Sequence, residues 1–235
     1  LGRKALEEGK LRGLIMEDPT GRSPRPKKEP SVSDCYSPEE CRKLLNAIQG
    51  DPLELPIAFA VLYGLRRSEI LGLRWGAVNF EQRCFTISHT VTVVSIHGHR
   101  QIIAADRVKR KSSFRTLPLM PYIAKLLRGH AAQRYGSQSP PHKDYICVNE
   151  NGKLIKPDTL SEQFQRIIKE NHLRRIRFHD LRHSCANLLI SARVPLIEVQ
   201  QWLGHSTIST TADLYSHLEY AHKERNADTN LQMML

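Results

Sequence analysis

One stretch of the sequence, residues 83–119, has the pattern of β-strands, and helical spacing of apolar residues occupies most of the remaining chain. Three β-branched or alternating runs stand in that stretch, at residues 84–88, 90–96 and 114–119. His97-Gly98-His99 and residues 108–113 separate these runs. The pattern therefore predicts a mainly α domain with one small antiparallel β-sheet, which is an α+β fold.

The clearest helix start is Ser37-Pro38-Glu39-Glu40, where Ser37 is a natural N-cap and Glu40 completes a capping box. Gly64 and Gly204 each follow a helical pattern and predict helix ends. No apolar stretch approaches the ~20 residues that a membrane span requires, so no transmembrane helix is expected. The expected helices cover residues 38–49, 56–63, 67–73, 121–135, 157–171, 178–191, 195–203, 207–215 and 217–231.

The first 30 residues differ from the rest in composition. Residues 1–16 have helical spacing, and residues 18–30 hold four prolines and a net positive charge, which is typical of an extended basic linker. The chain lacks an initial Met and has no secretory signal pattern, so we expect a fragment of a longer protein. The predicted boundaries are residues 1–30 for a helix end plus linker and residues 31–235 for the compact domain.

The charge balance predicts a polyanionic partner. The chain has 35 Lys and Arg against 24 Asp and Glu, a formal net charge of +11. Because only six Phe, seven Tyr and two Trp are present, a single-strand binder that stacks bases is disfavoured, and duplex nucleic acid fits the charge better. The five cysteines are odd in number and form no C-x-x-C pair, so reduced cytoplasmic thiols are expected and a zinc site is not.

The segment Arg174-Arg175-Ile176-Arg177-Phe178-His179-Asp180-Leu181-Arg182-His183 contains many cationic side chains. At 100° per residue its apolar side chains form one stripe, and His179 and Arg182 lie on the other side of the helix. One interpretation is a solvated basic face. A second is a zinc helix, because His179 and His183 are four apart, although Asp180 occupies the second position and no third ligand is evident.

Five short motifs occur in a fixed order along the chain. They are G-L-R-x-S-E at residues 64–69, a lysine in the β region followed by S-x-R-x-x-P, H-x-x-R at 179–182, L-G-H at 203–205, and a tyrosine ten residues later. In this order and spacing, residues 31–220 resemble the catalytic domain of tyrosine recombinases, the phage integrase family. The segments GLRRSEILGLRW and LGHSTISTTADLYSHL look most like integrases of temperate phages and conjugative transposons.

The resemblance implies the tyrosine recombinase catalytic-domain fold for residues 31–235, and the tail of a core-binding domain plus its linker for residues 1–30. It also implies a role for each motif residue. A tyrosine would attack a DNA phosphorus, two arginines and a histidine would stabilise the transition state, a second histidine would move the phenolic proton, and a lysine would protonate the leaving oxygen. Glu69 would orient the first arginine, and Lys111 remains an alternative for the lysine. The tyrosine is Tyr215, and the two arginines are Arg66 and Arg182. The histidine that stabilises the transition state is His205, the histidine that moves the proton is His179, and the lysine is Lys109.

The same resemblance implies the partners. Double-stranded DNA carrying specific recombination sites would be the substrate, four subunits would assemble on it, and an accessory directionality factor would be a further partner. No metal, ATP or other cofactor is implied, and the location would be the bacterial cytoplasm. The last residues, 221–235, would dock on a neighbouring subunit or fold back on the core of their own subunit. The alternatives are a type IB topoisomerase, a non-enzymatic basic DNA-binding module and a metal nuclease.

Overall fold

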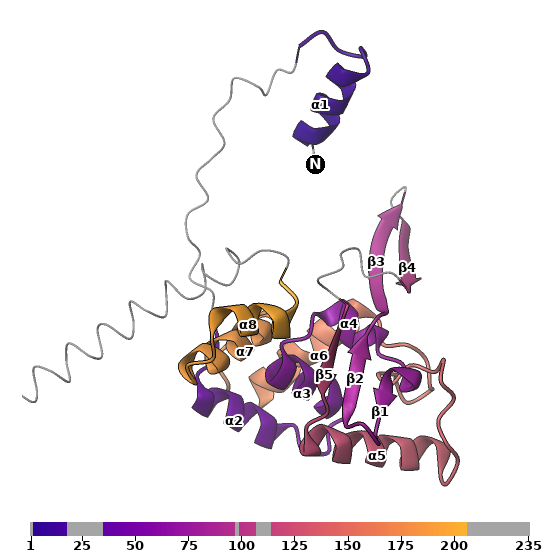
Figure 1. Cartoon of the computed structure of the whole chain (residues 1–235), viewed down its shortest axis with the longest axis vertical. Coiled ribbons are helices and arrows are strands. Elements are labelled where there is room, and N and C mark those ends of the chain that lie inside the picture. The colour runs from indigo at the N-terminus through magenta and orange to yellow at the C-terminus, as the bar shows by residue number, and fades with distance from the viewer. Residues whose placement is uncertain (1, 18–34, 97–98, 107–113, 206–235) are drawn as a thin grey trace, which may run out of the picture. The chain divides into compact units, whose positions relative to one another are not determined.

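The computed structural model describes residues 2–17, 35–96, 99–106 and 114–205. The chain divides into two compact units, Leu1–Val32 and Ser33–Leu235. In the first unit, helix α1 covers Gly2–Leu11 (Figure 1). It is shorter than the predicted 1–16 because Gly13 takes a left-handed φ of 71° just beyond it.

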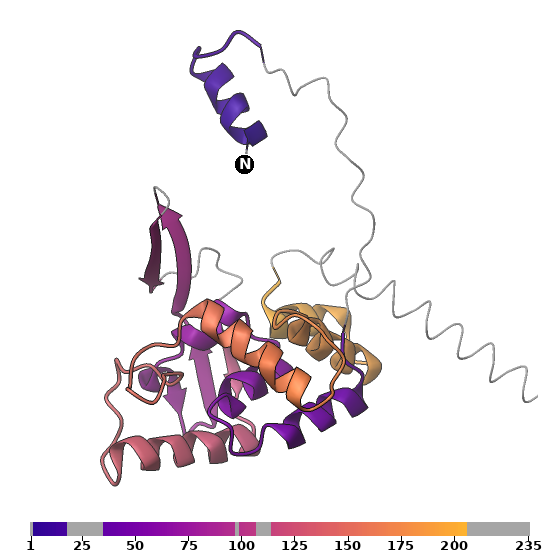
Figure 2. The ribbon, with the colours of Figure 1, turned by 180° about the vertical axis from the view of Figure 1, so that it is seen from behind.

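The second unit is mainly helical, as predicted. Helix α2 begins with the predicted capping box, in which the Ser37 hydroxyl accepts from the Glu40 N–H and the Glu40 carboxylate accepts from the Ser37 N–H. The predicted helices 207–215 and 217–231 lie outside the described residues. The described helices are α2 (Pro38–Ala47), α3 (Glu54–Tyr63), α4 (Arg67–Gly72), α5 (Pro121–Tyr135), α6 (Pro157–Glu170), α7 (Asp180–Ser191) and α8 (Leu196–Leu203), with a 3-10 turn at Trp75–Ala77 (Figures 1 and 2).

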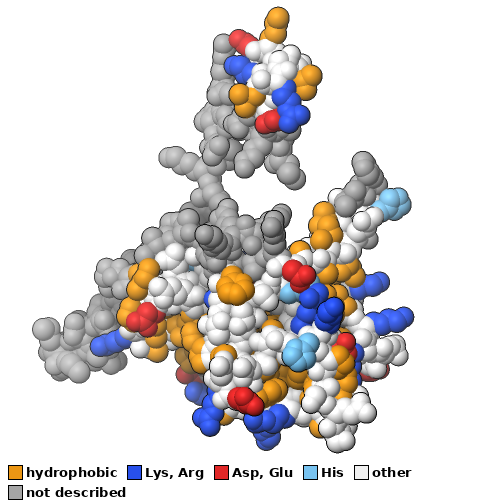
Figure 3. All heavy atoms as spheres, turned by 45° about the vertical axis from the view of Figure 1, so that its right-hand side comes forward, with side chains coloured by type: hydrophobic (Ala, Val, Ile, Leu, Met, Phe, Trp, Pro, Cys, Tyr) orange, Lys and Arg blue, Asp and Glu red, His pale blue; other side chains and the backbone are white. Residues whose placement is uncertain are grey.

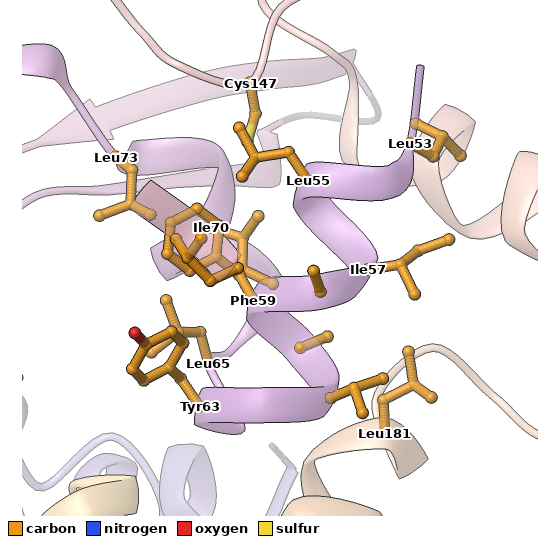
Figure 4. Close-up of a cluster of buried hydrophobic side chains, with 14 of the residues drawn as sticks. Leu53, Leu55, Ile57, Phe59, Tyr63, Leu65, Ile70, Leu73, Cys147 and Leu181 are labelled. Carbon is orange, nitrogen blue, oxygen red and sulfur yellow. The ribbon is translucent and has the colours of Figure 1, made fainter. Parts of the chain in front are cut away.

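Helix α3 is the centre of the core. Nearly all of its residues are buried, and its apolar side chains point to every side of the helix axis, toward α2, α4, α5 and α7 (Figure 4). A helix that is apolar all round must be surrounded by other elements, which explains why its sequence shows no polar face. None of the helices in the described ranges is long and apolar enough to cross a membrane.

The β region differs from the prediction, because it forms two sheets where one was expected. Strands β1 (Val78–Asn79), β2 (Cys84–Ile87) and β5 (Arg115–Pro118) make an antiparallel sheet in the order β1-β2-β5. Strands β3 (Thr90–Ile96) and β4 (His99–Ala105) make a separate antiparallel hairpin. Since β1 and β5 occupy both edges of β2, the chain after β2 cannot pair with β2 itself, and β3 pairs with β4 in a hairpin that extends away from the sheet (Figure 1).

The turn at Gly64 joins the core to the two helices that follow the β region. Gly64 ends α3 with a φ of 61°, and a Cβ atom there would lie 3.2 Å from Cys185 Cβ on α7 and would overlap the Leu203 side chain on α8. Helices α3, α7 and α8 can therefore approach this closely because residue 64 lacks a side chain.

We predict that Gly64→Ala lowers the free energy of unfolding by about 2–4 kcal/mol, because it adds overpacking to the cost of a left-handed alanine. Gly50→Ala is the matched control, since Gly50 also has a positive φ, of 78°, but nothing lies within 4 Å of the position that its Cβ atom would take. That control should lose only about 1 kcal/mol in urea unfolding. Equal losses for the two variants would show that the packing at Gly64 is not tight.

Candidate active site

The C-terminal end of α8 is the centre of the candidate site. Gly204 ends the helix in a left-handed conformation, and the His205 N–H turns back to the Gln200 carbonyl at 3.0 Å. The last carbonyl groups of a helix have no partners within it, and they carry the negative end of the helix dipole. Cationic donors from elsewhere in the chain can therefore bind there.

Three arginines from three other elements donate to the three consecutive carbonyls of residues 202–204. Arg115 Nε donates to the Trp202 carbonyl at 2.8 Å. Arg182 Nη2 donates to the Leu203 carbonyl at 2.7 Å, and Arg66 Nη2 donates to the Gly204 carbonyl at 2.9 Å. One short backbone segment thus fixes three guanidinium groups beside His205.

Arg182 is buried on α7, with 3% of its surface exposed. Its second nitrogen, Nη1, donates to the carbonyl of Gly64 at 2.6 Å, so the ends of α3 and α8 both accept from one guanidinium. Burial and the nearby charge of Arg66 lower the pKa of Arg182 to about 9, which leaves the group charged at neutral pH. The solvated basic face considered for this helix is therefore wrong for Arg182, because α3 and α8 pack against α7 there.

Glu69 links two of the arginines. Its carboxylate is 1% exposed, accepts from Arg66 Nη1 at 2.7 Å, and faces the Arg115 guanidinium at 3.2 and 3.3 Å. It also accepts from the Arg66 backbone N–H at 2.9 Å. Burial alone would raise the pKa of Glu69, but Arg115, Arg66 and Arg182 outweigh it and lower the pKa. The carboxylate is therefore ionised, and it holds both guanidinium groups in fixed orientations.

His205 follows the helix end and is 8% exposed. Burial, together with the positive charges of Arg182 and Arg66, lowers its pKa to about 3. The ring is consequently neutral at pH 7, and it has one N–H to donate and one nitrogen to accept.

His179 is the N-cap of α7 and, unlike Arg182, is exposed. Its ring lies edge to face against His183, with 5.3 Å between the centroids. Desolvation by the surrounding protein and repulsion from His183 and Arg182 lower the pKa of His179 to about 4, although part of its surface meets solvent. His179 is therefore unprotonated at neutral pH and can accept a proton.

The structure thus places Arg66, Arg182 and His205 together, with His179 close enough to respond to the arginine charges. Lys109, its alternative Lys111 and Tyr215 lie outside the described residues. Within the described ranges, no three His, Cys, Asp or Glu side chains gather in a group that could hold a metal ion.

Two parts of the candidate site were given no role from the sequence. Arg115 was visible only as the arginine of S-x-R-x-x-P, and its burial between Glu69 and Trp202 had no local signal. The carbonyls of residues 202–204 had only the helix-ending glycine to mark them. Both contributions depend on contacts between segments that are distant in sequence.

Comparison with known proteins gives a consistent result. The profile described as the phage integrase family matches residues 36–222. A XerC-like tyrosine recombinase from Caldanaerobacter subterraneus is 28% identical over 208 residues, which are 83% of this chain and 53% of that protein. The ICEBs1 integrase of Bacillus subtilis is 29% identical over 212 residues, 85% of this chain and 54% of that protein. The chain therefore spans about half the length of these relatives.

Solved structures share the fold. The Tn1549 transposon integrase, in complex with a circular intermediate DNA, superposes with a TM-score of 0.73 at 21% identity, covering 96% of this chain and 76% of that one. The XerA recombinase superposes with a TM-score of 0.63 at 19% identity, covering 94% and 74%. These likenesses confirm the predicted α+β catalytic-domain fold.

We predict that acid destabilises the domain partly through His205. Its pKa is about 3 in the folded protein and about 6.5 in an unfolded chain, so below pH ~6.5 the unfolded state binds a proton that the folded state does not. The free energy of unfolding should therefore fall as the pH drops from 6.5 toward 4, and His205→Gln should make this fall shallower. Urea unfolding across that range measures the slope, with the exposed His99→Gln as control. An unchanged slope in His205→Gln would contradict the prediction.

Proposed function

The chain belongs to the phage integrase family, and we propose that it is the catalytic part of a site-specific DNA recombinase that integrates or excises a mobile element. The observation that carries the proposal is the arrangement of charge at the end of α8. Three guanidinium groups and one carboxylate lie there, which leaves an excess of two positive charges beside the neutral ring of His205. Such an excess suits the transition state of phosphoryl transfer, in which negative charge accumulates on the non-bridging oxygens.

In the proposed reaction, Tyr215 attacks a backbone phosphorus of duplex DNA. A bond forms between the phenolic oxygen and phosphorus, and the bond from phosphorus to the 5′-oxygen breaks, which leaves a 3′-phosphotyrosyl link and a 5′-hydroxyl. The phenol needs a base because its ordinary pKa is about 10. His179 takes this proton, and the low pKa of its ring is what keeps it able to do so.

The remaining residues act on charge and on the leaving group. Arg66 and Arg182 bind the non-bridging oxygens through the donors that their carbonyl contacts leave unused, and His205 adds a neutral donor. Lys109 gives a proton to the departing 5′-oxygen. Glu69 keeps Arg66 in position through their ion pair. Rejoining is the reverse sequence with a new 5′-hydroxyl, so neither ATP nor a metal ion is required.

The similarity to an integrase solved on circular intermediate DNA supports double-stranded recombination sites as the substrate. We further propose that residues 1–30 are the end of a core-binding domain with its linker and residues 31–235 the catalytic domain. Four subunits would assemble on DNA in the bacterial cytoplasm, with residues 221–235 docking on a neighbour and a directionality factor as a further partner. The alternative of a type IB topoisomerase differs in its reaction, because such an enzyme would relax one duplex but would not exchange strands between two.

The first test is covalent trapping on a nicked suicide duplex. The unmodified chain should form a protein–DNA adduct, and Tyr215→Phe should form none, because the nucleophilic hydroxyl is lost. Duplex affinity should stay within about threefold because the net charge of +11 is unchanged. Tyr220→Phe is the matched control and should keep the adduct. An adduct in Tyr215→Phe would move the nucleophile elsewhere, and no adduct in any variant would favour a binding module.

The second test separates the two lysines. Lys109→Ala should slow cleavage of an ordinary phosphodiester by about 100-fold or more, and a 5′-bridging sulfur should restore the rate because a thiolate leaves without a proton. Lys111→Ala should show a much smaller defect and no such rescue. The reverse pattern in single-turnover assays would assign the general acid to Lys111.

A further inference from the structure

A second polar cluster lies at the other end of helix α4 from Arg66. His89 Nδ1 contacts the Asp106 carboxylate at 2.7 Å, and His89 Nε2 faces Arg74 Nη2 at 3.1 Å and the Tyr145 hydroxyl at 3.0 Å. Arg74 Nη1 also pairs with Asp106 at 3.0 Å. Since arginine can only donate, Nε2 is the accepting nitrogen and the Nδ1–H donates to Asp106. We call these four residues the hairpin-base network.

Its members come from four separate segments. Arg74 follows α4, His89 immediately precedes β3, Asp106 immediately follows β4, and Tyr145 lies in the loop after α5. His89 is 6% exposed, and the Asp106 side chain is 80% exposed beside a hollow of about 270 Å³. On this face, cationic, anionic and histidine side chains gather below the base of the hairpin (Figure 3).

The network is tied closely to the helix that carries Arg66. A Cβ atom at Gly72 would lie 2.5 Å from the His89 carbonyl, so the end of α4 packs directly on the backbone where β3 begins. Arg66 is the N-cap of the same six-residue helix, whose length is about 9 Å. The positions of Arg66 and of the network are thus coupled by one short, buried element.

Asp106 is also three residues before Lys109, the proposed general acid. A chain spans at most about 3.6 Å per residue, so Lys109 cannot lie more than roughly 11 Å from Asp106 along the backbone. Further along, Arg115 is fixed by Glu69 and by the Trp202 carbonyl. The two described residues on either side of the lysine are therefore each fixed, Asp106 by the hairpin-base network and Arg115 by the active site.

We propose that the hairpin-base network is a positioning device for the general acid, in which Arg74 and His89 hold Asp106 so that the following lysine meets the leaving oxygen. This inference rests on the proposed function. Asp106 itself does not contact the reacting atoms. It acts through the backbone by setting where the lysine-bearing stretch departs from the hairpin, relative to Arg66 on α4.

The alternative is that the network only stabilises the base of the hairpin. A two-stranded hairpin is marginally stable alone, so such a role is reasonable on general grounds. The two roles differ in chemistry. A misplaced general acid harms only reactions that need a proton on the leaving group, whereas a loosened hairpin harms cleavage whatever the leaving group is.

The experiment measures single-turnover cleavage by Asp106→Ala on an ordinary phosphodiester and on its 5′-bridging sulfur analogue. We expect a loss of about 10- to 100-fold on the oxygen substrate, as for a catalytic group displaced by about 1 Å, and a rate within about threefold of the unmodified chain on the sulfur substrate. Asp106→Asn, which keeps the side-chain shape, should show the same pattern with a smaller loss. Both replacements are at an exposed side chain, and a melting temperature checks that the fold is kept.

Glu170→Ala is the matched control, because Glu170 is an exposed acidic side chain that pairs with an arginine, Arg166, at 3.7 Å on α6 and outside the hairpin-base network. It should cleave both substrates at the rate of the unmodified chain. An equal loss on the oxygen and sulfur substrates for Asp106→Ala, or no loss on either, would overturn the positioning role while leaving the proposed function in place. Failure of the unmodified chain to form a covalent product on either substrate would instead overturn the proposed function, and the positioning role with it.

Discussion

Three consecutive carbonyls at the end of α8 each accept a hydrogen bond from a different arginine, and the candidate site depends on this arrangement. The negative end of the helix dipole and the unpaired carbonyls offset part of the cost of holding three cations close together in a partly buried place. Because the same turn continues directly into His205, the backbone that binds the arginines also fixes the histidine. One helix end therefore organises groups that come from four different elements.

The requirement for this helix end explains several features of the fold. Helix α8 must lie against α3 and α7, and Gly64 allows that approach by lacking a side chain. Glu69 must be ionised and buried, since it separates Arg66 from Arg115 and reduces their repulsion. Burial is the main cause of the low pKa values of His205 and His179, and the positive charge of the nearby arginines lowers both values further. The packing of these helices and the protonation states of the two histidines therefore depend on the same buried, positively charged site.

The β region illustrates where sequence patterns stop being informative. Alternating residues correctly indicated strands between residues 83 and 119, yet they did not show that β3 and β4 would form a hairpin apart from the sheet. Strand pairing is decided by which edges remain free, and β2 has none once β1 and β5 are in place. The hairpin-base network depends on this separate hairpin, because pairing of β3 with β4 brings His89 and Asp106, at its two ends, together beside Arg74.

The sequence alone determined the fold class, most helix bounds and the motif residues, since caps, glycine ends and apolar periodicity are set by neighbours within a few positions. It indicated the capping box at Ser37 and the helix ends at Gly64 and Gly204 for that reason. Only the tertiary structure decided that Arg182 is buried and that Arg66 contacts Gly204, 138 positions away. Such contacts depend on how whole helices pack, and no local pattern in a single sequence encodes which distant carbonyl a buried arginine will meet.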